Sequence, residues 1–154
     1  MPVWLAPLHL SILPPPTKLE ANEFSFVENS GNTNPYKTIT STNSSELENL
    51  WVTGSGAGSK ATGYWVDSDG QEATFTNLGN IYVTAVDGAN SWSQRAIGAA
   101  DGATAINKGT IVVQNAYGMT VGSDKNGSTP AKIINEGSIA VYDTGAAMEL
   151  GGVK

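Results

Sequence analysis

The chain has 154 residues and a net charge of −6, with 8 Lys and Arg against 14 Asp and Glu, and it contains no cysteine. This composition excludes disulfides, thiolate metal sites and cysteine nucleophiles, and the shortage of basic residues leaves no surface to neutralise a nucleic acid. No run reaches the roughly 18 apolar residues of a membrane-spanning helix, so no such segment is predicted.

Residues 1–20 are predicted to form a Pro-rich apolar arm or linker. Five of the first sixteen residues are proline and the first basic residue is Lys18, so the segment lacks the charged start and the helical centre of a signal peptide. His9 is the single histidine of the chain. Because one imidazole without Cys or a second His cannot build the usual metal sites, we interpret His9 as part of this arm.

Residues 21–48 are polar and rich in turn-forming residues, and we interpret them as a capping segment. Short strands are expected at Glu23–Val27 and Tyr36–Thr42. Such a segment would cover the first coil of a repeat structure, since an uncovered sheet edge favours aggregation.

Residues 49–154 contain an internal repeat with the pattern Asn-x-Gly-x-Ile-x-Val. Its three copies are Asn77/Gly79/Ile81/Val83, Asn107/Gly109/Ile111/Val113 and Asn135/Gly137/Ile139/Val141, with offsets of 107 − 77 = 30 and 135 − 107 = 28. A period between about 20 and 50 residues is typical of stacked repeats. The sequence therefore predicts an all-β fold, a β-solenoid of about three to four rungs, in which Leu50-Trp-Val52 forms a degenerate first rung with Glu46 and Glu48 in place of Asn and Gly.

A second strand is expected after each Ile-x-Val. The segments aligned for it are Gly63–Val66, Gly98–Asp101, Gly118–Val121 and Ala147–Leu150. Alternation predicts inward side chains at Tyr64, Val66, Met119, Val121, Met148 and Leu150, and outward side chains at Trp65, Thr120 and Glu149. Each coil would thus have at least two strands, joined by Gly-, Asp- and Asn-rich turns.

The recurring Asn and Gly predict structural roles. Asparagines stacked at the strand spacing of about 4.8 Å would bond one another in a ladder. The glycines are expected to supply a backbone conformation that a side chain would strain.

Several segments resemble chemical sites only in part. Asp67-Ser-Asp-Gly-Gln-Glu72 resembles a calcium loop without its full ligand spacing, and Ser123–Gly127 is similar. Gly54–Lys60 lacks the Gly-Lys-Ser/Thr of a phosphate loop. The carboxylates from which a glycoside-cleaving pair would have to come are Asp67, Asp69, Glu72, Asp87 and Asp101, and nothing singles out a pair. No catalytic residue, metal site or cofactor is predicted.

The segment Thr84–Arg95 is the strongest candidate for binding, because it lengthens one turn of the repeat and insertions of this kind protrude. Its candidate binding residues are Asp87, Asn90, Trp92 and Arg95. Trp and Arg are enriched at interface hot spots. The alternative is that Trp92 folds back over the coil.

The repeat, together with Ala-Tyr-Gly-Met-Thr-Val and Gly-Ala-Ala-Met-Glu-Leu, resembles the passenger repeats of Gram-negative autotransporter adhesins. The resemblance implies a right-handed parallel β-helix, exported through a C-terminal outer-membrane barrel that this chain does not contain. It implies a non-catalytic domain for adhesion at the cell surface, with a host-cell protein, a glycan or another bacterial surface as partner. The alternatives are a carbohydrate-active β-helix, a lyase or hydrolase of polysaccharides, and a purely structural stalk.

The end of the chain carries no predicted cap. We therefore expect residues 1–154 to be part of a longer passenger, and we expect the isolated chain to self-associate through its C-terminal end.

Overall fold

The computed structural model describes residues 24–29, 35–40, 43–54, 61–67, 69, 71–85, 94–122 and 130–150, whose regular structure is β-strand throughout. Within these ranges there is no helix long and apolar enough to cross a membrane. The predicted arm at residues 1–20, and His9 with it, lies outside the described residues.

The strands form three parallel sheets, named A, B and C here. Sheet A contains β1 (Ser25–Asn29), β4 (Leu50–Gly54), β7 (Asn80–Ala85), β10 (Thr110–Gln114) and β13 (Ser138–Tyr142). Sheet B contains β2 (Lys37–Ile39), β5 (Thr62–Asp67), β8 (Arg95–Ala100), β11 (Tyr117–Val121) and β14 (Met148–Leu150). Sheet C contains β3 (Asn43–Glu46), β6 (Thr74–Asn77), β9 (Thr104–Asn107) and β12 (Lys132–Asn135).

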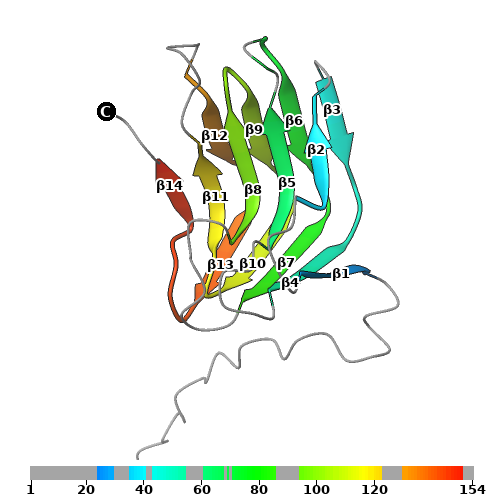
Figure 1. The fold of residues 1–154 in the computed structure, drawn as a ribbon, viewed down its shortest axis with the longest axis vertical. Coiled ribbons are helices and arrows are strands. Elements are labelled where there is room, and N and C mark those ends of the chain that lie inside the picture. Colours follow the sequence, from blue (N-terminus) through cyan, green and yellow to red (C-terminus); the bar gives the residue numbers. More distant parts are fainter. Residues whose placement is uncertain are drawn as a thin grey trace, which may run out of the picture.

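The chain visits the sheets in the order A, B, C and then repeats, which confirms the predicted β-solenoid. Strands β4–β6, β7–β9 and β10–β12 form complete inner coils, so each coil has three strands (Figure 1). The sequence predicted at least two strands per coil. The third sheet comes from the residues just before each Asn-x-Gly, where the chain bends from sheet C into sheet A.

The apolar positions of the repeat stack in columns inside the coil. Ile81 pairs in register with Ile111, and Ile111 with Ile139; the valines two residues later pair in the same way. Ile81, Ile111, Val83 and Val113 are fully buried. Each buried side chain of this size contributes about 1.5–3 kcal/mol by removal from water, so the columns form the main core.

The expected asparagine ladder is present. The Nδ2 group of Asn77 donates to Oδ1 of Asn107 at 2.8 Å, and Nδ2 of Asn107 donates to Oδ1 of Asn135 at 2.8 Å. Asn77 and Asn107 are fully buried. Since a buried polar group without a partner is costly, the ladder satisfies these amides and ties successive coils together.

The recurring glycines are required for a different reason from the one expected. Positive φ values among the described glycines occur at Gly102 and Gly145, not in the repeat. A β-carbon at Gly109 would instead collide with the carbonyl oxygen of Gly79, and one at Gly137 with that of Gly109, both well inside 3.0 Å. Successive coils therefore approach so closely here that their backbones occupy the space of a side chain.

The alignment of the second strand was wrong by two residues in one coil. Tyr64 pairs with Ile97 and Ile97 with Met119, so the residue equivalent to Gly63 and Gly118 is Ala96 and not Gly98. Gly98 instead pairs with Trp65. The error arose because glycine was matched to glycine, whereas alanine also fits this position.

The inward side chains of the last strand differ from their predicted burial. Met148 and Leu150 pair with Met119 and Val121, as expected, but their exposed fractions are 42% and 71%, against 0% for Met119. The reason is that no coil lies beyond β14 among the described residues. Burial in this fold is thus supplied by the following coil.

Residues interpreted as a polar cap supply β1, β2 and β3, which are the first strands of their sheets. Glu46 pairs in register with Asn77 and forms an ion pair with Lys37. The Glu48 carboxylate accepts hydrogen bonds from Ser25, from Tyr36 and, at 3.4 Å, from Tyr64. Acidic side chains therefore replace the asparagine and glycine of the repeat at this end.

We expect Ile111→Asp to unfold the domain, because it places an unpaired carboxylate in a dry core at a cost of several kcal/mol. The matched control is Val112→Asp on the same strand, where the side chain is only partly buried. Circular dichroism should show loss of the strand signal in the first variant only. A retained signal in Ile111→Asp would contradict the architecture.

We expect Gly109→Ala to destabilise the domain by about 1–3 kcal/mol, since the new methyl group overlaps the Gly79 carbonyl oxygen and must push the coils apart. The neighbouring Thr110→Ala serves as the control and should change stability little. Urea unfolding of both variants measures the difference. Equal midpoints for the two would show that the close approach is not required.

We expect stability to fall at alkaline pH because of Tyr64. Burial, followed by the nearby Glu48 and Glu46 carboxylates, raises the pKa of this phenol above its ordinary value. The unfolded chain releases the proton near pH 10, so stability is complete below about pH 10 and declines above it. Urea unfolding at pH 8 and pH 11 should show a smaller decline in Tyr64→Phe than in the unchanged chain.

Candidate functional site

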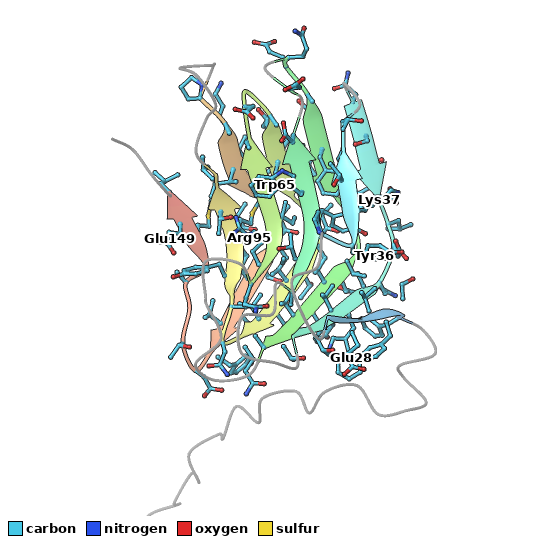
Figure 2. All side chains as sticks on the ribbon, viewed as in Figure 1. Glu28, Tyr36, Lys37, Trp65, Arg95 and Glu149 are labelled. Carbon is cyan, nitrogen blue, oxygen red and sulfur yellow. The ribbon has the colours of Figure 1, made fainter. Side chains whose placement is uncertain are left out.

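The outer face of sheet B contains the strongest candidate site. One outward row crosses the sheet in register, through Thr38, Trp65, Gly98, Thr120 and Glu149. Figure 2 shows Trp65, Arg95 and Glu149 along this sheet, with Tyr36 and Lys37 at its other end. The row joins large, small and charged side chains from successive coils.

The Trp65 indole lies across the backbone of the neighbouring strands. A β-carbon at Gly98 or at Gly122 would come closer than 3.0 Å to carbons of its ring, so both positions leave room for it. The indole Nε1 group donates to Oδ2 of Asp67 at 3.4 Å. An aromatic ring over a glycine in the facing strand compensates for the missing side chain, so Trp65 is fixed on the surface of the coil.

The guanidinium of Arg95 packs on this indole. Its Cζ atom lies 5.2 Å from the centroid of the Trp65 ring, which is cation–π distance. Nη1 donates to Oγ1 of Thr120 at 2.9 Å. Burial lowers the pKa of Arg95, while the Glu149 carboxylate opposes this shift, and arginine remains protonated because its ordinary pKa exceeds 12. The site therefore holds a fixed cation against an aromatic face.

Thr120 was predicted to point outward, and its row is the outward one, yet it is only 1% exposed. The hydrogen bond from Arg95 explains part of this burial, because the guanidinium lies over the Thr120 side chain. The arrangement needs residues of three coils, and no local pattern in the sequence indicates it.

The predicted binding loop lies mostly outside the described residues, which applies to Asp87, Asn90 and Trp92. Arg95 is described, and it is the first residue of β8 and partly buried rather than part of an exposed loop. Its pairing with Thr62 and Tyr117 places it in the sheet. The binding role of the loop stays a prediction.

The described candidate carboxylates have roles in turns. Oδ1 of Asp67 accepts from the Asp69 backbone N–H at 3.0 Å, and Asp69 has a φ of 52°. Asp101 has a φ of 49° and is 1% exposed, while Glu72 is exposed. No group of three His, Cys, Asp or Glu side chains able to hold a metal occurs in the described part of the chain. Asp87, residues 55–60 and residues 123–127 lie outside it.

A second surface, on the outer face of sheet A, was missed by the sequence reasoning. Trp51 pairs in register with Phe26 and Tyr82. The rings of Phe26 and Trp51 meet edge to face at 5.0 Å, those of Phe24 and Tyr82 at 5.1 Å, and Phe26 is 50% exposed. The available signal was the aromatic residue between the two inward positions of Leu50-Trp-Val52 and Ile81-Tyr-Val83.

Comparison with known proteins places this fold in a family. The family model described as the BigA third pectate lyase-like domain matches residues 20–153. No curated protein and no solved structure matches the chain.

Proposed function

The chain belongs to the family of the BigA third pectate lyase-like domain, and from this premise we propose that it is a non-catalytic, surface-exposed domain that binds a partner and spaces it from the cell. It acts within the passenger of a Gram-negative autotransporter adhesin, outside the cell and tethered to the outer membrane. The partner is a host-cell protein or glycan, or another bacterial surface. No cofactor takes part.

The observation that carries this proposal is the Trp65–Arg95 pair on the outer face of sheet B. Trp and Arg give more binding energy per residue than most other types because they combine a large apolar surface with directed polar groups. Here the cation is oriented by Trp65 and Thr120, so it loses little entropy when it meets a partner. The segment with Trp92 leads directly into Arg95, which brings a further aromatic residue into the same sequence neighbourhood.

The inner face of the coil supports a spacing role. Its apolar columns and its asparagine ladder are used to join one coil to the next. Asp67 and Asp69 shape a turn, a use that favours binding over acid–base chemistry. The flat outer faces of the sheets are then the surfaces that can vary without loss of the fold.

We expect Trp92→Ala combined with Arg95→Ala to weaken adhesion at least about tenfold, or ~1.4 kcal/mol, without loss of the strand signal. The measurement is binding of the labelled domain to cultured epithelial cells. Thr76→Ala combined with Thr104→Ala on the outer face of sheet C is the matched control and should bind as the unchanged chain does.

Unchanged affinity in a folded double variant would leave the structural stalk as the remaining role. The carbohydrate-active alternative is separated by a second readout on the same protein, the chain length of polygalacturonate after incubation. We expect that length to stay constant; shortening of the polymer would replace the binding proposal by a polysaccharide-cleaving one.

A further inference from the structure

The asparagine ladder has a direction. In each step the side-chain amide of one coil donates to the oxygen of the following coil, from Asn77 to Asn107 and from Asn107 to Asn135. Each amide also donates to the carbonyl of the glycine two residues later, at 3.1 Å in Asn77 and 3.3 Å in Asn107 and Asn135. An amide nitrogen has two N–H groups, so the second one serves the next coil.

Asn135 is the last member of the ladder. Its oxygen accepts from Asn107 and its nitrogen donates to the Gly137 carbonyl, but none of the described residues takes the place that Asn135 itself takes for Asn107. Its side chain is exposed. The ladder thus presents one directed N–H donor at the C-terminal end of the solenoid.

Apolar side chains surround this donor. Ile139 and Val141 are partly buried, whereas Ile111 and Val113, their equivalents one coil earlier, are fully buried. Met148 and Leu150 are more exposed still. Together with the free edges of β12, β13 and β14, these side chains form a surface that we call the end face. It is the same surface that each earlier coil buries against its successor.

The N-terminal end is built differently. Glu48 occupies the position of the repeat glycine, since a β-carbon at Gly79 would meet the Glu48 carbonyl as one at Gly109 meets that of Gly79. A coil stacked before Glu48 in this register would have its carbonyl oxygen at the Glu48 β-carbon. Glu48 is also occupied by Ser25, Tyr36 and Tyr64. The first coil of a second copy therefore does not fit the end face in register.

We propose that the end face is a docking surface for a further β-solenoid coil that carries Asn-x-Gly in register, and not for a second copy of this chain. The Asn oxygen accepts from Asn135, and the glycine admits the Gly137 carbonyl. This continues an interface that the chain forms between each pair of its own coils, and it goes beyond the adhesive role because it does not depend on what the outer faces bind.

The test extends the whole chain through Leu150 with a second copy of residues 122–150, which supplies one coil with Asn-x-Gly. Amide hydrogen exchange at low protein concentration is the readout. We expect exchange in β12, β13 and β14 to slow about tenfold or more when the coil is added. Unchanged exchange would overturn the proposal, and binding of the extended protein to cells would be unaffected, so this failure is distinct from failure of the adhesive role.

Two variants of the extended chain test the chemistry. Asn135→Asp keeps the oxygen that accepts from Asn107 but removes the donor to the added coil, and we expect the added protection to be lost. The same substitution in the chain without the extension is the matched control and should leave exchange unchanged. Gly137→Ala in the added copy should also abolish the gain. Equal protection in all extended variants would overturn the Asn-x-Gly requirement, and protection that appears in the unextended chain as its concentration rises would identify a second copy as the occupant.

Discussion

The close approach of successive backbones at Gly79, Gly109 and Gly137 is the constraint on which the rest of the structure depends. A carbonyl oxygen of one coil occupies the space where the next coil would have a β-carbon. Because only one residue type fits, this contact sets the register between coils, and a shift by one residue would turn every inward side chain outward. The asparagine two residues earlier then meets its equivalent at hydrogen-bond distance. The glycine and the asparagine therefore act together, one by shape and the other by direction.

Fixing the register inside the coil leaves the outer faces free to carry different residues. The outward row through Trp65, Gly98, Thr120 and Glu149 has no repeated residue type, whereas the inward columns repeat isoleucine and valine. The site on sheet B uses this freedom across coils, since its tryptophan, its arginine and its threonine belong to three different strands. A rigid scaffold with a variable surface is the arrangement expected of a binding domain.

The sequence allowed the core to be predicted because the same few residues recur at the same spacing. The columns at Ile81, Ile111 and Ile139 and the ladder at Asn77, Asn107 and Asn135 follow directly from the repeat. The physical role of the glycines could not be read in this way, because positive φ and close backbone approach both select glycine and only the distance to the preceding carbonyl separates them. The alignment at Gly98 failed for a related reason, since that glycine makes room for an indole from another coil and not for a backbone turn.

The candidate site was less predictable than the core because it depends on contacts between coils at positions without a pattern. Arg95 could be singled out by its neighbour Trp92, but its stacking on Trp65, about thirty residues earlier, needed the register of β5 and β8. The same dependence on neighbours explains the ends of the molecule. Met119 and Met148 occupy equivalent positions, and one is buried while the other is 42% exposed. In a stacked coil, then, whether a side chain stabilises the fold or offers a surface to a partner is decided less by its residue type than by whether another coil follows it.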